Sequence, residues 1–212
     1  MANSKTVLPL AQRPLDFVYY AFFASHLCAS LLLDCQAIYP ERFVPTILVE
    51  ANKMYISMTR DPLIGSVFGY FGQDMSQHML WFKMFLYLEA FFQVPVFIIG
   101  MRQLRKGEFV PFTLRAPPDP VWLGCKYVYP LLLAYGASSA TTTFACLAVL
   151  LTTPTTTPAL LASNAPSLDT FQRQLLFGSY FAFFVIPLLM AVDMTFRIKN
   201  LIGKAVKAEK LE

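Results

Sequence analysis

The chain has 212 residues, of which 56% are apolar and 15% aromatic, whereas only 14% are charged. This composition is too apolar for a soluble domain of that length and predicts one compact integral membrane protein. The net charge is only +4, and lysine and arginine flank apolar segments without forming a basic patch interleaved with aromatic residues. We therefore do not expect nucleic acid as a partner.

The cysteines indicate neither a disulfide framework nor a metal site. All four, Cys28, Cys35, Cys125 and Cys146, fall within apolar segments, where buried thiols are the simpler interpretation. No pair has the C-x-x-C spacing of a metal or redox site. We expect no metal and no cofactor.

Four segments are long enough to cross roughly 30 Å of hydrocarbon at about 1.5 Å per helical residue. They cover approximately residues 15–39, 81–104, 121–151 and 171–196. The predicted fold is an all-α membrane protein with a bundle of four transmembrane helices. The first apolar run is long, aromatic-rich and without a small-residue cleavage site, which predicts a retained first transmembrane helix and not a signal peptide.

Proline interrupts three of the predicted helices. Pro95, Pro130 and Pro187 each remove one helical hydrogen bond and free one carbonyl. In a membrane, a neighbouring group or a water-lined cavity must satisfy that carbonyl, so the prolines are compatible with an internal pocket. Plain kinking of the helices is the simpler explanation.

The connections differ in character. Residues 49–59 alternate polar and apolar side chains, which predicts an interfacial helix that ends before Pro62. Residues 65–77 are expected to form a glycine-containing loop. Residues 152–169 are rich in Thr and Pro and contain no Lys or Arg, so we expect an exposed, poorly ordered loop there.

Positive charge predicts the orientation in the membrane. The second connection contains Arg105, Lys106 and Arg115, and the tail over residues 197–212 is basic. By the positive-inside rule, the N-terminal tail (residues 1–14), this connection and the C-terminal tail are cytoplasmic. The first and third loops then lie on the opposite side.

Asp34 lies in the first apolar run, where a carboxylate near the middle of a membrane helix costs roughly 2.5 to 3.5 kcal/mol. On a helix, His26, Ser30 and Asp34 are successive i, i+4 neighbours, and Glu89 and Gln93 have the same spacing in the second span. If these stripes face each other, they enclose a polar pocket. An aromatic wall would come from Phe82, Phe85, Tyr87, Tyr135 and Tyr180.

Interhelical hydrogen bonding is the alternative use for these side chains, at about 0.6 kcal/mol per bond. It is the simpler interpretation for Gln93, Ser30 and His26. For Asp34 and Glu89, whose burial costs more, ligand binding and structural pairing are equally compatible with the sequence.

Two further acids have local explanations. Asp193 has Arg197 four residues later, near a helix end, which predicts an interfacial ion pair. Asp61 precedes Pro62, as a helix N-cap does. Alternatively, Asp61 lies near Asp34 and forms a coupled acid pair that shares a proton. The sequence pattern alone favours the cap.

A set of ordered motifs with compatible gaps runs through the first half of the chain. They are Ser25-His26, Leu33-Asp34-Cys35-Gln36-Ala37, Tyr39-Pro40, Arg60-Asp61-Pro62-Leu63, Trp81-Phe82-Lys83 and Glu89-Ala90-Phe91-Phe92-Gln93-Val94-Pro95. In these motifs the chain resembles the sigma-2 receptor (transmembrane protein 97) family of the EXPERA group, which also includes the emopamil-binding sterol isomerases. The similarity extends over residues 15–193. Longer loops suggest a fungal relative of the type associated with efficient mitochondria targeting.

The resemblance implies a four-helix endoplasmic-reticulum membrane protein, generally a homodimer, whose cavity opens towards the bilayer and binds sterols and cationic amphiphiles. Asp34 matches the acid that pairs with a ligand amine, and Asp61 matches the acid that orients it. Other ligand-contacting positions implied by the resemblance or by the polar stripes are His26, Glu89, Gln93, Thr142, Tyr180 and Phe183. At Phe183 the family has a tyrosine, so one hydroxyl is missing here.

These observations favour a non-enzymatic protein that binds sterols, cationic amphiphiles or membrane lipid, with no catalytic residue assigned. The implied role is in sterol homeostasis or in the handling of mitochondrial precursors at the reticulum. The alternative is a sterol double-bond isomerase that moves protons with Asp34, Glu89 and His26. A third class is an interaction factor whose basic tail, residues 197–210, attracts anionic lipid or partners.

Overall fold

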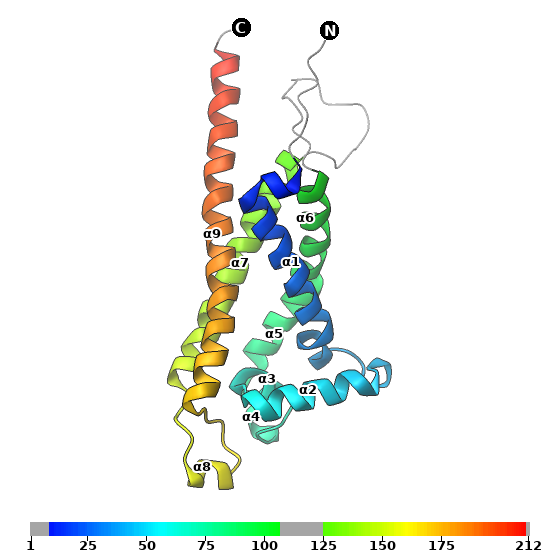
Figure 1. Cartoon of the computed structure of the whole chain (residues 1–212), viewed down its shortest axis with the longest axis vertical. Coiled ribbons are helices and arrows are strands. Elements are labelled where there is room, and N and C mark those ends of the chain that lie inside the picture. Colours follow the sequence, from blue (N-terminus) through cyan, green and yellow to red (C-terminus); the bar gives the residue numbers. More distant parts are fainter. Residues whose placement is uncertain (1–8, 107–124, 211–212) are drawn as a thin grey trace.

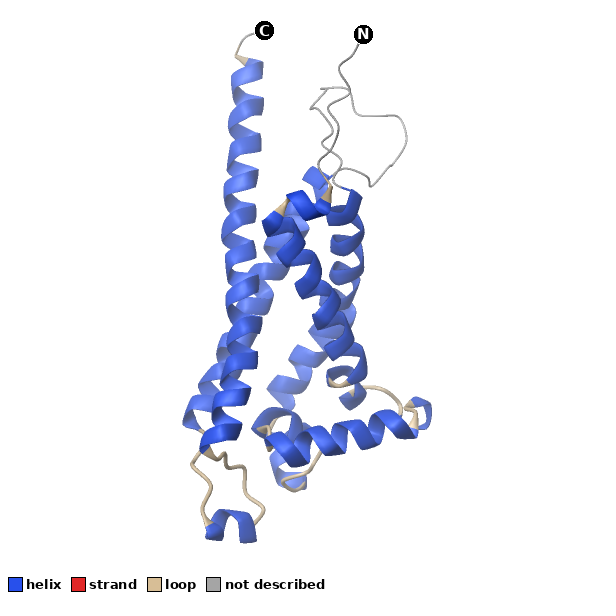
Figure 2. Cartoon of the chain, viewed as in Figure 1, coloured by secondary structure: helices blue, strands red, loops and turns tan. Residues whose placement is uncertain are grey.

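The protein is described here by a computed structural model covering residues 9–106 and 125–210. In chain order its elements are η1 (Leu10–Gln12), α1 (Pro14–Leu32), η2 (Asp34–Ala37), η3 (Glu41–Phe43), α2 (Thr46–Thr59), α3 (Pro62–Val67), α4 (Gln73–His78), α5 (Leu80–Leu88), the π-helical turn η4 (Glu89–Gln93), α6 (Val94–Lys106), α7 (Cys125–Thr152), α8 (Pro158–Ala162) and α9 (Thr170–Glu209). Within these ranges the regular structure is helical, as Figure 2 shows.

Four helical segments are long and apolar enough to cross a membrane: Pro14–Ala37, Leu80–Lys106, Val128–Thr152 and Thr170–Glu209. They run along the long axis of the molecule, and α2 crosses one end nearly at right angles to them (Figure 1). The beginning of α1 and the C-terminal part of α9 lie at the opposite end (Figure 1). Among the described residues, the expected all-α fold with four spans is confirmed, and α2 lies in the first connection, where an interfacial helix was expected.

The first apolar run is not one helix, because α1 ends at Leu32 and Asp34 begins a separate 3-10 turn. Side-chain amides hold this end. Gln36 donates from Nε2 to the carbonyls of Leu32 and, at 3.1 Å, Leu48. Asn52 of α2 donates to the carbonyl of Leu33 at 3.3 Å. The bonds to Leu32 and Leu33 satisfy carbonyls that a continuing α1 would otherwise use. Asp34 therefore leaves the helical stripe expected for it.

The second span is divided in another way. A π-helical turn over Glu89–Gln93 separates α5 from α6, and Pro95 is the second residue of α6. Proline has no N–H, so the wider turn absorbs the bond that it removes. Pro130 and Pro187 lie inside α7 and α9, as the sequence predicts.

The segment over residues 65–77 is more helical than expected, because α3 and α4 occupy much of it. Asp61 begins α3: its Oδ1 accepts hydrogen bonds from the backbone N–H of Leu63 at 2.9 Å and of Ile64 at 3.1 Å. Pro62 takes the first helical position. The expected cap is therefore present.

The connection over residues 152–169 is fastened to the rest of the molecule. Thr155 and Leu168 form a β-bridge, and Leu168 is fully buried. Arg60, in the left-handed region at φ 49°, donates to the carbonyls of Ala165 at 2.9 Å and Ser167 at 3.3 Å. The expectation of a poorly ordered loop was wrong, because backbone and side-chain bonds to distant residues hold it.

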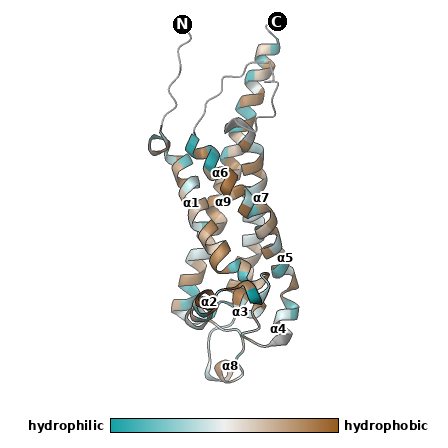
Figure 3. Ribbon diagram, turned by 90° about the vertical axis from the view of Figure 1, so that its right-hand side faces the viewer, coloured by the Kyte–Doolittle hydropathy of each residue, from teal (hydrophilic) through white to brown (hydrophobic). Residues whose placement is uncertain are grey.

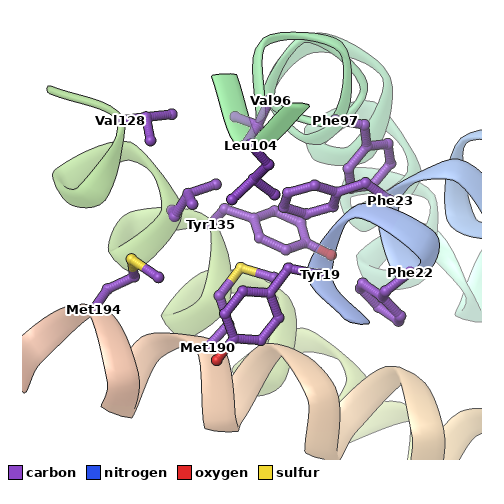
Figure 4. Close-up of a cluster of buried hydrophobic side chains, with 11 residues drawn as sticks. Tyr19, Phe22, Phe23, Val96, Phe97, Leu104, Val128, Tyr135, Met190 and Met194 are labelled. Carbon is purple, nitrogen blue, oxygen red and sulfur yellow. The ribbon is translucent and has the colours of Figure 1, made fainter. Parts of the chain in front are cut away.

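The largest core cluster lies where α1, α6, α7 and α9 meet (Figure 4). Its buried members are Tyr19, Phe22, Phe23, Val96, Phe97, Leu104, Val128, Leu132, Tyr135, Met190 and Met194. Helices α7 and α9 come very close at Gly136, where a Cβ would lie 2.6 Å from the carbonyl oxygen of Pro187. Small residues permit such approach between membrane helices.

A network of charged groups joins the beginning of α1 to the C-terminal half of α9 beyond this core. Arg197 pairs with Asp193 at 2.8 Å and with Asp16 at 3.0 Å, and Arg13 pairs with Asp16 at 2.6 Å. The expected Asp193–Arg197 pair is confirmed, and Asp16 extends it across helices. Hydrophilic residues also gather at the end of α6 and along the last turns of α9 (Figure 3).

Candidate functional site

A cavity of about 230 Å³ lies between the spans, and residues of α2 and α3 close one side of it. Its walls are formed by His26, Ala29, Leu33, Asp34, Tyr55, Ile64, Phe82, Phe85, Leu86, Glu89, Gln93, Ser139, Thr142, Thr143, Cys146, Ser179, Tyr180 and Phe183. The structure thus brings together all but one of the eight residues expected to contact a ligand: Asp34, Asp61, His26, Glu89, Gln93, Thr142, Tyr180 and Phe183. The exception is Asp61, which does not line the cavity.

Asp34 occupies the first position of η2, just past the end of α1. Glu89 and Asp61 are its charged neighbours. Within the described residues, its carboxylate accepts no hydrogen bond and forms no ion pair. Because a carboxylate in apolar surroundings is costly unless it is paired, Asp34 is the acid with bonding capacity left for a ligand.

Glu89 is held by protein groups although it also lines the cavity. Ser30 donates a short hydrogen bond from Oγ to Oε1 of Glu89. Nε2 of His26 lies 3.5 Å from the same oxygen. The hydroxyl of Tyr135 lies 3.4 Å from Nδ1 on the other edge of the His26 ring. The interhelical pairing considered for His26 and Ser30 therefore exists, and it positions Glu89.

Asp61 lies behind the cavity wall and is fully buried. While its Oδ1 caps α3, its Oδ2 accepts hydrogen bonds from the hydroxyls of Tyr55 at 2.8 Å and Tyr180 at 3.0 Å. Burial raises the pKa of the Asp61 carboxyl above its ordinary value, and these hydrogen bonds partly offset the rise. Burial and the nearby Asp61 charge also raise the pKa of Tyr55. The structure makes Asp61 a positioning group for two tyrosines that line the cavity.

The aromatic wall is only partly the one expected. Phe82, Phe85 and Tyr180 line the cavity. Tyr87 does not, because it is 36% exposed and stacks on Phe91 at the outer surface. Tyr135 is fully buried in the core and contacts His26, which lines the cavity.

Several polar lining groups were not predicted from the sequence: Tyr55, Ser139, Thr143, Cys146 and Ser179. On α7 a signal was present, because Ser139, Thr142, Thr143 and Cys146 follow the i, i+3, i+4, i+7 spacing of one helix face. Tyr55 had no such signal, since its position depends on how α2 packs under the spans.

The chemistry of the cavity is that of an acidic, otherwise mostly apolar site. Two carboxyl groups, Asp34 and Glu89, line it, and no lysine or arginine is among its lining residues. The described residues contain no group of three His, Cys, Asp or Glu side chains placed to hold a metal ion. Such a site suits a cation or a hydroxyl donor attached to an apolar body.

The model of the family EXPERA (EXPanded EBP superfamily) matches residues 47–194, from α2 to the second half of α9. The chain belongs to the EXPERA family. This confirms the family that the motifs indicated, and it places Tyr55, Asp61 and Glu89 inside the matched region.

Curated relatives of this EXPERA protein extend over nearly its whole length. It is similar to Sigma intracellular receptor 2 of Xenopus tropicalis, with 26% identity over 195 residues that cover 89% of this chain and 92% of the relative. The human protein of that name is 23% identical over 186 residues, covering 88% and 90%. Efficient mitochondria targeting-associated protein 19 of Schizosaccharomyces pombe is 26% identical over 191 residues, covering 90% and 80%.

Proposed function

We propose that this EXPERA-family membrane protein binds sterols or cationic amphiphiles, with Asp34 as the anchor for their hydroxyl or amine group. One observation carries the proposal: Asp34 faces the cavity without a hydrogen bond or ion pair among the described residues, whereas Glu89 and Asp61 have partners. In a cavity of low dielectric constant, an ammonium–carboxylate contact is stronger than it is in water.

The other walls supply orientation and apolar contact. Gln93 lines the cavity and offers an amide to a second polar group of the ligand. Thr142 also lines it, but its hydroxyl donates to backbone carbonyls of α7, so only its oxygen is left, as an acceptor. Asp61 acts through Tyr55 and Tyr180, whose hydroxyls it fixes. The aromatic rings of Phe82 and Phe85 accept the hydrocarbon part.

The proposal extends to the cellular setting. The basic C-terminal tail and the even number of spans support cytoplasmic termini. The names of the relatives support either of two roles, that of an intracellular receptor or that of a protein associated with targeting to mitochondria. From the motif resemblance we propose sterol homeostasis for the first role and the handling of mitochondrial precursors for the second. We place the protein in the endoplasmic reticulum as a homodimer on the resemblance of its motifs to the sigma-2 receptor family.

The test compares Asp34→Asn with the wild-type protein, both purified in detergent, for binding of a radiolabelled cationic amphiphile and of cholesterol. Loss of the charge should weaken amine binding by about tenfold, since hydrogen bonds to charged groups are stronger than neutral ones by about 1 to 1.5 kcal/mol. Cholesterol binding should weaken less, because asparagine still accepts a hydrogen bond. Glu50→Gln is the control, because Glu50 is exposed on α2 and pairs with the equally exposed Lys53. Unchanged amine binding in Asp34→Asn would refute the proposal.

A second candidate, sterol double-bond isomerisation, has one observation in its favour. His26 and Glu89 are 3.5 Å apart and both line the cavity, as an acid and a base would. The discriminating measurement is turnover: incubation of the purified protein with an 8-ene sterol and detection of the 7-ene product. Product that disappears in Glu89→Gln would establish the enzymatic function.

A further inference from the structure

A second hollow adjoins the cavity on the outer side of the bundle, between α1 and α9. This groove has a volume of about 480 Å³. It is lined by Phe17, Val18, Ala21, Phe22 and Ser25 from α1 and by Ala182, Phe183 and Ile186 from α9. Ser25 is the one polar residue, and its hydroxyl is already engaged, since it donates to the carbonyl of Phe22 at 2.9 Å. The groove therefore offers only hydrocarbon contact.

Three aromatic rings divide the groove from the cavity. Phe183 lines both spaces, Phe22 lines the groove, and His26 lines the cavity. The ring of Phe183 lies 5.6 Å from that of Phe22 and 4.6 Å from that of His26. At Phe183, which lines both spaces, the partition is thus one side chain thick.

The two volumes are complementary in size as well as in chemistry. Pockets for drug-sized ligands commonly have about 300 to 1,000 Å³, and the cavity of about 230 Å³ falls below that range. With the groove added, the site falls within it. All the carboxyl groups belong to the cavity, and the groove has none.

We propose that cavity and groove are the two halves of one site, built for a long-chain amine whose ammonium lies at Asp34 and whose hydrocarbon tail lies between α1 and α9. This inference rests on the proposed function, because it takes Asp34 as the anchor. A single flexible chain passes the Phe22–His26–Phe183 partition with less displacement than a flat, rigid ring system. The groove thereby selects for the length and flexibility of the apolar part.

The test measures two amines, hexylamine and dodecylamine, by isothermal titration calorimetry on the full chain in detergent. Ala21→Trp fills the groove from α1, and Ala182→Trp fills it from α9; both alanines are exposed, so folding is little affected. Leu31→Trp is the matched control, because Leu31 is 41% exposed on α1 and lines neither space. The ratio of dodecylamine to hexylamine affinity is compared, so that partition of the amines into micelles cancels.

In each groove variant we expect this ratio to fall by at least about tenfold, because a tenfold change in affinity corresponds to the burial of only a few methylene groups. The affinity for hexylamine should stay nearly constant. Leu31→Trp should keep the wild-type ratio. A ratio that is unchanged in both groove variants, or that falls equally in Leu31→Trp, would overturn the inference.

Asp34→Asn separates this inference from the function on which it rests. This variant should lower the affinity for both amines to a similar extent and leave the ratio of the two affinities unchanged. If Asp34→Asn weakens neither amine, the proposed function fails. If it weakens both while the groove variants leave the ratio intact, the proposed function stands and only the bipartite site is refuted.

Discussion

The hydroxyl of Tyr180 donates a hydrogen bond of 3.0 Å to Oδ2 of Asp61, although 119 residues separate them in the chain. Tyr55 donates to the same oxygen at 2.8 Å, and Oδ1 of Asp61 caps α3. One carboxyl group therefore ties α2, α3 and α9 together at the cavity wall. Both tyrosine rings line the cavity, so Asp61 shapes the site without facing a ligand.

Removal of the Tyr180 hydroxyl should measure the strength of this connection. Tyr180→Phe should lower the free energy of unfolding by about 1 to 3 kcal/mol, because a buried polar group loses a partner. Denaturant unfolding in mixed micelles gives this value. The control is Tyr87→Phe, since Tyr87 is partly exposed at the outer surface. Equal stability of the two variants would contradict a structural role for the Tyr180–Asp61 bond.

The raised pKa of Asp61 predicts a dependence of stability on pH. Folding favours the protonated carboxyl, so this contribution is complete below the ordinary pKa of 3.8 and is lost as the pH rises through the higher folded-state value. Asp61→Asn, which still caps α3, lacks this titration. The wild-type protein should therefore lose stability relative to Asp61→Asn as the pH rises from about 4 towards neutrality.

Thermal unfolding of the two proteins over this pH range checks the sign. Effects of other carboxyl groups are common to both proteins and cancel in the difference. A stability difference that stays constant with pH would show that folding does not raise the pKa of Asp61.

The close approach of α7 and α9 predicts opposite effects at two helical glycines. At Gly136 a Cβ would meet the Pro187 carbonyl oxygen at 2.6 Å, whereas at Gly178 it would meet nothing within 4 Å. Gly136→Ala should therefore cost about 1 to 3 kcal/mol through overpacking. Gly178→Ala should stabilise α9 by roughly 0.5 to 1 kcal/mol through its helix propensity. Unfolding curves of the two variants that shift in the same direction would refute this packing argument.

The charged network around Arg197 should contribute more to the free energy of unfolding than an exposed ion pair does. Arg197→Met leaves Asp193 without its ion-pair partner and removes one of the two partners of Asp16. We expect a loss of about 1 to 3 kcal/mol, reduced from the fully buried case because Arg197 is partly exposed. Lys53→Met removes an exposed pair with Glu50 and should cost below about 1 kcal/mol. Comparable losses, measured by denaturant unfolding, would show that burial adds nothing at Arg197.

Much of the candidate site could be predicted from the sequence. Asp34 and Glu89 were recognisable because acids in apolar runs are costly, and Gln93 and Thr142 followed from spacing and motif resemblance. The cap at Asp61 was predicted from the proline that follows it. The sequence did not indicate Tyr55, because an interfacial helix can pack beneath the spans in many rotations, and each rotation presents different side chains to the cavity.

The sequence by itself determined the number of spans and the all-helical fold, because the length of an apolar run and the need to satisfy backbone groups in lipid leave little choice. Only the tertiary structure decided which acid was left without a partner. Amide side chains from α2 and η2 bond to the end of α1, which stops at Leu32 and leaves Asp34 at the cavity. Ser30 donates a hydrogen bond to Glu89, and Tyr55 and Tyr180 donate to Asp61. Such pairings depend on contacts between distant segments, which local pattern does not encode.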